Sequence, residues 1–296
     1  MKIYGEKSKY VVISASRMTD MPEFYPARII SETEKRREKG LVVHTLVLWT
    51  KHPSALFREP LSGYLKKLSS DGSQIFLQLT ITGMGGARQL CDVSGKPLCG
   101  IDGRPFSIEP FSPPVNESLA MMERVVEALG SPERIRLRFD PIVRIADSRG
   151  SVYSNSVFMP VVIEKASAAG VKNFTFSFLE KGMHAKVDRR FSAIGCSIIP
   201  PTFTERAEFG EKIREYESKF GVSISACCVE GFDDSRCIDG ALLSGTHEGN
   251  VPAAMRELRR RPKCGCTESI DIGGWPPLPC ANGCLYCYSN PAIAIR

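Results

Sequence analysis

Several features of common protein classes are missing from this chain. No apolar run is long enough to cross a membrane, and the first ten residues, MKIYGEKSKY, lack the apolar segment of a signal peptide. The four histidines show no metal-ligand spacing. There is no P-loop, no Rossmann glycine fingerprint after a strand, and no GxSxG elbow. These absences argue against membrane proteins and the commonest nucleotide-binding and hydrolytic enzymes, and we expect a cytoplasmic protein.

Cysteine, in contrast, is abundant. The chain has 296 residues, of which 43% are hydrophobic, so it can bury a full core. Its eleven cysteines are an odd number. In a reducing compartment such a content favours metal or cluster ligation over disulfides.

The formal net charge of +6 is only mildly basic. Bound clusters with thiolate ligands would offset part of it, so charge is weak evidence for a nucleic-acid partner. The most basic segment is the run 256–263, RELRRRPK, which adjoins the cysteine-rich tail. It either complements a helix C-terminus or holds a phosphate-bearing substrate or nucleic-acid backbone.

Short apolar, β-branched runs alternate with charged amphipathic stretches. The runs predict strands, and the stretches between them predict helices. The helix over 204–220 begins at Thr204 as N-cap and ends at Gly221. The predicted strands are 10–16, 42–50, 74–82, 134–142, 173–179 and 222–228, and the predicted helices include 22–39, 116–129, 154–169 and 204–220.

Alternation of strands and helices implies an α/β fold with a parallel sheet. Six such units suit a partial (β/α)6 TIM-barrel-like fold, while a doubly wound open sheet gives the same periodicity. We expect a barrel-like domain over 1–230, with an insertion at about 84–113, and a cysteine-rich C-terminal segment, 231–296, packed on it.

The most informative motif is CANGCLYC, in which Cys280, Cys284 and Cys287 form a CxxxCxxC pattern with Tyr286 before the third cysteine. A closed [4Fe–4S] cluster takes four thiolates, and this loop offers three. The spacing resembles the signature of radical S-adenosylmethionine (SAM) enzymes. That resemblance implies a cluster whose open iron binds SAM, one-electron cleavage of SAM, and a reductant such as flavodoxin or ferredoxin. A closed Fe–S or zinc site is the alternative.

The segments 13–25, 46–53, 79–85 and 138–142, together with the tail from Cys264 to Asn290, resemble domain-of-unknown-function family 1848. The resemblance implies a radical-SAM-like fold with its cluster loop permuted to the C-terminus. A barrel-like sheet would bring that loop beside the first strand, so we expect residues just after that strand to face it. Met18 departs from the family pattern, in which an arginine is usual, and Cys91 and Cys99 lie in the insertion as ordinary thiols.

A second cysteine group is Cys228, Cys237, Cys264 and Cys266, with Cys227 as the expected extra. Four thiolates suffice for an auxiliary [4Fe–4S] cluster or a tetrahedral zinc. The alternative is that these cysteines are small buried apolar residues.

Polar residues at predicted strand ends supply candidate ligand contacts, because α/β sheets bind ligands at the carboxyl ends of their strands. For SAM we expect Arg17 to meet the carboxylate and Asp20, Asp140 or Glu230 the ammonium or ribose. The place of Tyr286 in the motif implies packing on adenine. The alternative for Arg138, Asp140 and Arg144 is a local ion-pair network.

These patterns together predict a radical SAM-type enzyme that abstracts hydrogen from a substrate the sequence does not identify. Two alternatives remain: a non-catalytic iron–sulfur or zinc protein, and a radical SAM enzyme that modifies nucleic acid.

Overall fold

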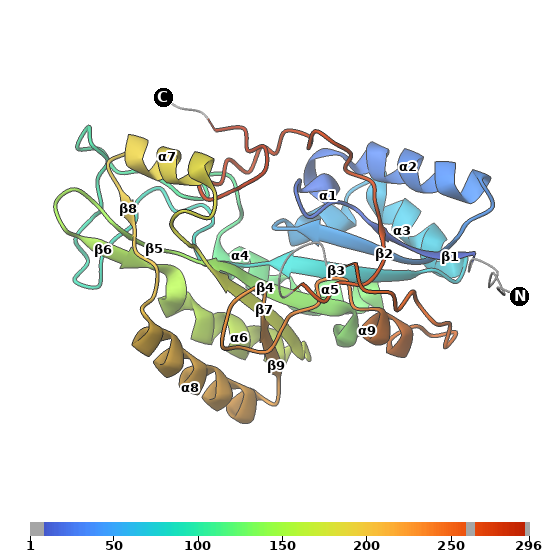
Figure 1. Ribbon diagram of the computed structural model, residues 1–296. Helices are drawn as coiled ribbons and strands as arrows, with labels where there is room; N and C mark the ends of the chain where they lie inside the picture. Colours follow the sequence, from blue (N-terminus) through green and yellow to red (C-terminus); the bar gives the residue numbers. More distant parts are fainter. Residues whose placement is uncertain (1–8, 259–263, 294–296) are drawn as a thin grey trace, which may run out of the picture.

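The apolar runs form the strands of one curved parallel sheet in a computed structural model that describes residues 9–258 and 264–293 (Figure 1). Six strands follow one another across the sheet in chain order, and the short β10 adds to the free side of β1. The strands, in spatial order, are β10 (Ile270–Asp271), β1 (Tyr10–Ser14), β2 (Val42–Thr50), β3 (Gln74–Thr80), β4 (Ile135–Ile142), β7 (Asn173–Phe178) and β9 (Ser223–Ala226).

All six predicted strands are confirmed, with ends that differ by no more than two residues. The α/β class with a parallel sheet is therefore confirmed. Barrel closure is not observed: across 9–258 and 264–293, β10 and β9 are the sheet edges and do not pair with each other. A short strand such as β10, with two residues, carries too little pattern to be predicted from sequence.

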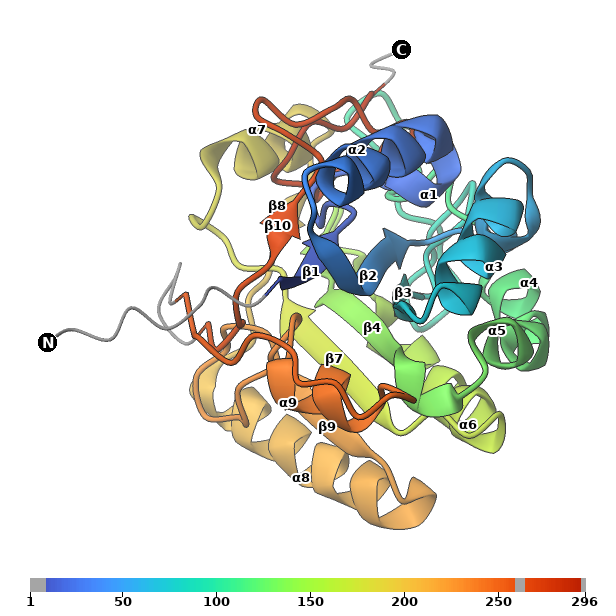
Figure 2. The ribbon, with the colours of Figure 1, turned by 90° about the vertical axis from the view of Figure 1, so that its right-hand side faces the viewer.

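Amphipathic helices line the outer face of the sheet (Figure 2). The predicted helix 22–39 is two helices, because Pro26 cannot donate a backbone hydrogen bond and Tyr25 leaves the helical conformation at φ −138°. The helices are α1 (Met21–Phe24), α2 (Pro26–Glu38), α3 (Leu61–Ser70), α4 (Val115–Ala120), α5 (Met122–Leu129), α6 (Met159–Ala168), α7 (Ala185–Ala193), α8 (Phe203–Phe220) and α9 (Gly240–Gly245), with 3₁₀ turns η1 (Pro53–Phe57), η2 (Pro132–Arg134) and η3 (Asn155–Phe158).

Helix α8 begins at Phe203, one residue earlier than predicted. Thr202 is its N-cap and forms a capping box with Glu205, so the assignment of Thr204 as the cap is wrong. Gly221 ends the helix in the left-handed region at φ 60°, as predicted. The error arose because both threonines precede the same acidic residues and only the backbone conformation separates them.

Strand β3 shows how the sheet is buried on both faces. Ile75, Leu77 and Leu79 join the main core under the helices, while Phe76 and Gln78 lie on the other face and are equally buried. Burial on both faces is the usual condition of parallel strands.

The inner, concave face is covered by residues 227–258 and 264–270, which include α9 (Figure 2). The Gln74 Nε2 donates to the Leu243 carbonyl at 3.1 Å, and the Gln78 Nε2 donates to the Cys237 carbonyl at 2.5 Å. Amide side chains of the sheet thus hold parts of this covering segment in place.

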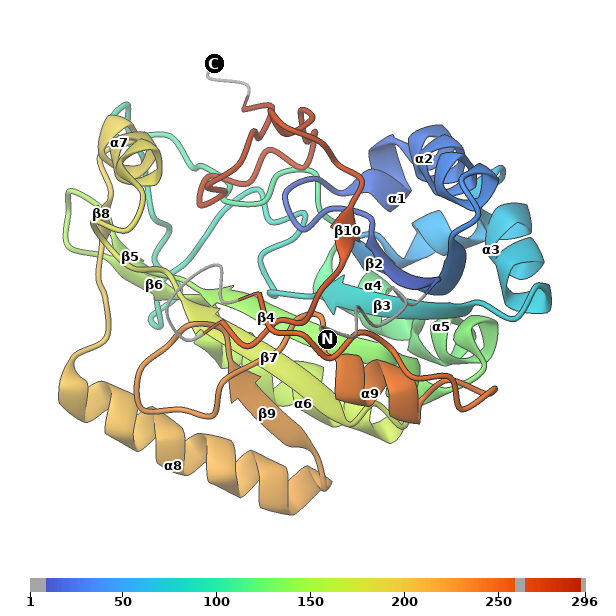
Figure 3. The same ribbon diagram turned by 45° about the vertical axis from the view of Figure 1, so that its right-hand side comes forward.

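Beyond the carboxyl ends of the strands lies a second structural layer (Figure 3). It contains a three-stranded antiparallel sheet, residues 84–113, α7 and part of the C-terminal loop, joined by one apolar cluster. The three strands are β5 (Arg144–Ala146), β6 (Val152–Ser154) and β8 (Ser197–Ile198). Residues 84–113 are therefore part of this layer beyond the strand ends.

Among the helices of 9–258 and 264–293, none combines the length and the apolar composition that a bilayer crossing demands.

Candidate functional site

The C-terminal cysteine loop lies against the first strand's end because β10 pairs in parallel with β1. The register places Ile270 beside Ile13 and Asp271 beside Ser14. The chain then crosses the carboxyl ends of the strands, where the Thr19 hydroxyl donates to the Leu278 carbonyl at 2.9 Å. The expectation that residues after the first strand face the cysteine loop is confirmed.

Asp20 is the main polar anchor of this loop. It is 5% exposed, and its Oδ2 accepts from the Lys51 N–H at 2.8 Å and from Asn282 Nδ2 at 3.2 Å. Asn282 in turn pairs its Oδ1 with His52 Nε2 at 2.6 Å. Burial raises the pKa of Asp20, and the positive field of His52 and these hydrogen bonds oppose the rise. The Asp20 oxygens thus join the ends of β1 and β2 to the loop.

The three loop cysteines are close enough to influence one another and are largely enclosed. Cys280 and Cys284 are buried and Cys287 is partly buried. Burial raises the pKa of all three thiols. The loop turns through Gly283 at φ 64°, a conformation that favours glycine, and the Ser289 N–H points at Cys287 Sγ at 3.4 Å.

Positively charged side chains surround this thiol group. Lys51, Lys186 and Arg190 each lower the pKa of Cys287 against the effect of its burial. Arg190 Nη1 also donates to the Cys287 carbonyl at 2.6 Å, and Lys186 Nζ donates to the Ser289 carbonyl at 2.5 Å. Basic groups from β2's end and α7 therefore converge on the loop, where they favour thiolates.

A buried carboxylate, Glu109, completes the site, and sequence reasoning missed it. Its side chain is 2% exposed, and its Oε1 accepts from Lys51 Nζ at 3.0 Å and from Thr82 Oγ1 at 2.7 Å. The Tyr286 hydroxyl donates to the same oxygen. Glu109 sits in the expected insertion, a segment without periodicity, so nothing in the sequence distinguished it from a solvated loop acid.

Tyr286 points into the layer above the sheet. Its ring packs with the second apolar cluster, and Lys51 Nζ lies 5.6 Å from the ring centroid. Burial, followed by the nearby Cys284 and Glu109, raises the pKa of its hydroxyl. Tyr286 thus connects the cysteine loop to Lys51 and Glu109; its predicted packing on adenine stays a prediction.

The other predicted SAM contacts lie apart from one another. Asp140 pairs with Arg138 and accepts from the Ser177 hydroxyl. Arg144 instead pairs with Glu205 at 2.6 Å, so the proposed network of Arg138, Asp140 and Arg144 is present only for the first two.

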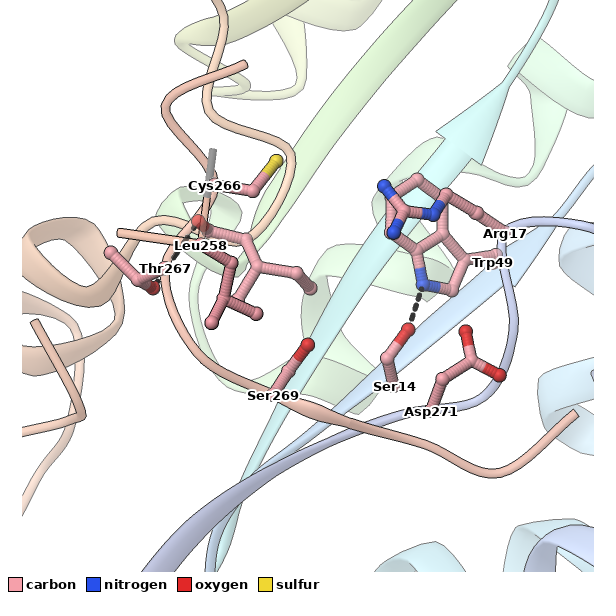
Figure 4. A pocket seen from close by; sticks show the side chains of 9 residues that line it. Ser14, Arg17, Trp49, Leu258, Cys266, Thr267, Ser269 and Asp271 are labelled. Carbon is pink, nitrogen blue, oxygen red and sulfur yellow. Dashed lines mark hydrogen bonds between the residues drawn. The ribbon is translucent and has the colours of Figure 1, made fainter. Parts of the chain in front are cut away.

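Arg17 and Glu230 lie elsewhere. Arg17 lines a small cavity with Trp49, Cys266 and Asp271, next to the second cysteine group rather than at the loop (Figure 4). Glu230 is exposed after β9.

The second cysteine group does come together, on the concave face of the sheet. Cys227 contacts both Cys228 and Cys237 through its thiol, and Cys237 also contacts Cys266. Cys264 is buried nearby in the same apolar cluster. The expectation that Cys227 is an extra residue outside the ligand set stays a prediction, although its thiol contacts Cys228 and Cys237.

Within 9–258 and 264–293, no three His, Cys, Asp or Glu side chains are arranged so that they could hold one metal ion. This applies to both cysteine groups. All eleven cysteines are free thiols.

The basic run 256–263 is only partly within the described chain. Arg256 is exposed and pairs with Glu268 at 2.7 Å, while residues 259–263 lie outside the described residues.

Comparison with protein families gives one match, the family described as "Domain of unknown function (DUF1848)", over residues 98–289. The chain belongs to this family. No curated protein matches. Among solved structures, the chain is similar to "Alpha-N-acetylgalactosaminidase NagBb from Bifidobacterium bifidum - quadruple mutant", at 11% identity and a TM-score of 0.26. The alignment covers 70% of this chain and 40% of that one, so the chain spans well under half of that protein.

The DUF1848 match includes both cysteine groups, Glu109 and strands β4, β7 and β9. It begins within the stretch expected to be an insertion, whose second half therefore belongs to the DUF1848 region. The resembling segments 13–25, 46–53 and 79–85 lie before it.

Proposed function

We propose that this DUF1848 protein is a radical SAM-type enzyme in which Cys280, Cys284 and Cys287 hold a [4Fe–4S] cluster with one open iron. The observation that carries the proposal is the position of the CxxxCxxC loop: β10 places it at the carboxyl end of β1, among buried polar groups. Carboxyl ends of parallel strands are where α/β sheets bind ligands. When bound and reduced, such a cluster supplies one electron to the sulfonium of SAM.

The donor set fits this group. Three thiols on one short loop match a cluster that keeps one iron open, and a cubane distributes its thiolates over separate irons rather than around one ion. The five cysteines of the second group pack in a different cluster, and Cys99 and Cys196 lie beside Asp147.

Charge supports the same assignment. Lys51, Lys186 and Arg190 face the loop, opposed by the carboxylates of Asp20 and Glu109. A [4Fe–4S]²⁺ cluster with three thiolates carries a net charge of −1, and these basic side chains would help to neutralise it. Buried charges are stable only when paired in this way.

The protein's own residues hold the loop and shape the space beside it. Asp20 and Asn282 fix the loop to the ends of β1 and β2, and Glu109 orients Lys51 and the Tyr286 hydroxyl. We propose that Lys51 and Asp140, which lie close enough to interact, face the ligand on the inner side of the loop.

Arg17 and Glu230 have weaker support as SAM contacts, because neither lies at the loop. The substrate is not identified by any group described above, and a flavodoxin- or ferredoxin-type reductant would provide the electron.

The rival function is a non-catalytic metal site. It differs from the proposal in one observable, the binding of SAM. A closed cluster has no iron with an open coordination position, and a zinc site has no iron at all, so neither would bind SAM in this way. The nucleic-acid alternative rests on residues 256–263; Arg256, the first of them, is already paired with Glu268.

The test compares Cys284→Ala with Cys196→Ala, two replacements of buried cysteines in different places. Both variants and the parent would be reconstituted anaerobically with iron and sulfide, and iron content and SAM affinity measured. We expect Cys284→Ala to lose the loop's iron and SAM binding, and Cys196→Ala to keep both. A parent protein that loads iron but does not bind SAM contradicts the proposal.

A further inference from the structure

The concave face of the sheet contains a second concentration of metal-binding chemistry that the proposed function does not use. Three separate segments bring thiols there: Cys227 and Cys228 after β9, Cys237 before α9, and Cys264 and Cys266 before β10. Thiol contacts run from Cys227 to Cys237 and from Cys237 to Cys266. No disulfide holds these cysteines together, because all of them are free thiols.

Two buried arginines of β4 face these thiols. Arg138 Nη1 donates to Cys237 Sγ at 3.1 Å, and Arg136 lies close to Cys237 and Cys266. Their side chains are 8% and 7% exposed. Guanidinium groups are charged at any accessible pH, so each demands a negative partner in this interior.

Carboxylates meet part of that demand. Asp140 pairs with Arg138, and Asp239 approaches Arg136 to 3.9 Å. Arg136 Nε is buried without a hydrogen-bond partner. Gln78 Oε1, on the neighbouring strand, is also buried and unpartnered. An unpartnered buried donor usually marks an absent ion or water.

We infer that Cys227, Cys237, Cys264 and Cys266 bind a thiophilic metal centre whose negative charge is neutralised by Arg136 and Arg138. A zinc ion with four thiolates and a [4Fe–4S]²⁺ cluster with four thiolates both carry a charge of −2, and Arg136 and Arg138 are the positive groups that would face it. On loading with Zn²⁺, four thiols would release four protons to solvent and form four zinc–sulfur bonds, with no change of oxidation state. A [4Fe–4S]²⁺ cluster would form from two Fe²⁺, two Fe³⁺ and four sulfide ions, again with four thiols deprotonated and no net electron transfer.

The ligand set differs from the one expected from sequence, because Cys227 replaces Cys228. Cys227 contacts Cys237 and lies within the field of Arg138. Cys228 touches Cys227 and occupies the left-handed region at φ 57°, whereas the contact with Cys237 is made by Cys227. The described thiols touch one another rather than surround a point, so binding requires them to rotate about their side-chain bonds.

This inference is independent of the loop cysteines, and the experiment keeps the two apart. The full chain with Cys280, Cys284 and Cys287 all replaced by alanine would be loaded anaerobically, in one arm with Zn²⁺ alone and in the other with equal amounts of Fe²⁺ and Fe³⁺ together with sulfide. Metal and sulfide per chain would be measured after desalting. We expect one zinc ion in the first arm or one four-iron cluster in the second, and the arm that resists a chelator identifies the native centre.

Further replacements in that background test the ligands. Adding Cys237→Ser or Cys227→Ser should abolish loading, whereas Cys228→Ser and the buried control Cys196→Ser should leave it intact. Circular dichroism of the unloaded variants shows whether each is folded. If Cys237→Ser is not folded, Cys266→Ser replaces it as the test of the ligands. Arg138→Met should weaken metal affinity by about ten- to a hundred-fold, the usual effect of removing an outer partner of a metal site.

Three results would overturn the inference. The first is that neither metal loads the parent in stoichiometric amount. The second is that loading survives Cys237→Ser. The third, which would overturn the ligand assignment, is that Cys228→Ser abolishes loading while Cys227→Ser does not.

Discussion

Replacing Glu109 gives the sharpest stability test of the site. Its carboxylate accepts from Lys51, Thr82 and Tyr286 in a place where 2% of the side chain is exposed. Glu109→Ala leaves the Lys51 ammonium buried without its ion-pair partner, which costs about 3–5 kcal/mol. The two hydroxyls lose an acceptor as well, but they are free to reorient, so we expect about 4 kcal/mol in total.

Glu109→Gln separates the contribution of the charge from that of the hydrogen bonds. The amide keeps an oxygen that can accept from Thr82 or Tyr286 but lacks the charge that Lys51 needs. We expect it to cost about 2 kcal/mol, between the alanine variant and the parent. The double variant Lys51→Met with Glu109→Leu removes both charges, and it should be more stable than Glu109→Ala by about 1–3 kcal/mol.

The assay is urea denaturation of the metal-free protein, followed by circular dichroism and fluorescence, with coincident transitions required before free energies are compared. Glu127→Ala is the matched control, because Glu127 is an exposed acid on α5, and its change should stay within about 0.5 kcal/mol. A loss below about 1 kcal/mol for Glu109→Ala would refute the buried network.

Two further predictions concern the second layer and α8. Asp147 accepts from the N–H groups of Cys99 and Ser151 and from Arg149; although burial raises its pKa, these bonds hold the pKa below 3.8. Its stabilisation is therefore present above about pH 4 and is lost as pH falls through the folded-state pKa, so Asp147→Asn should cost about 2 kcal/mol at pH 7 and progressively less below pH 4. Equal costs at pH 7 and pH 3 would contradict this. Thr202→Ala should destabilise by about 1 kcal/mol in denaturant titrations, whereas Thr204→Ala should change stability by under about 0.5 kcal/mol. The reverse order would show that the capping box is misassigned.

The six strands could be predicted because runs rich in apolar and β-branched residues alternate with charged, amphipathic stretches. The contact between the cysteine loop and the first strand was also expected, but from barrel closure, whereas the structure produces it by pairing β10 directly with β1. That prediction rested on topology, and β10, the strand that produces the contact, carried no pattern of its own.

The rest depended on the three-dimensional arrangement. Glu109 reaches Lys51 and Tyr286 only because residues 84–113 fold back over β3, with an isolated bridge between Gly85 and Glu109. The antiparallel strands β5, β6 and β8 have two or three residues each, too few to show alternation. Arg144 pairs with Glu205, 61 positions away, rather than with Asp140, which is much nearer in the sequence.

The second cysteine group gives another case in which sequence alone was not enough. Adjacent cysteines cannot be ranked by spacing; in the structure Cys228 has a positive φ of 57° and the Cys227 thiol contacts Cys237. Counting cysteines in the sequence picked out residues that the structure brings together, but it could not choose between these two neighbours.

The most direct test of the central proposal is electron paramagnetic resonance of the anaerobically reconstituted and reduced protein, with and without SAM. The account predicts a [4Fe–4S]⁺ signal that changes on addition of SAM and is lost in Cys284→Ala, with 5′-deoxyadenosine released by the parent. A loop-cluster signal that is the same with and without SAM would contradict the open iron and indicate a closed, non-catalytic site.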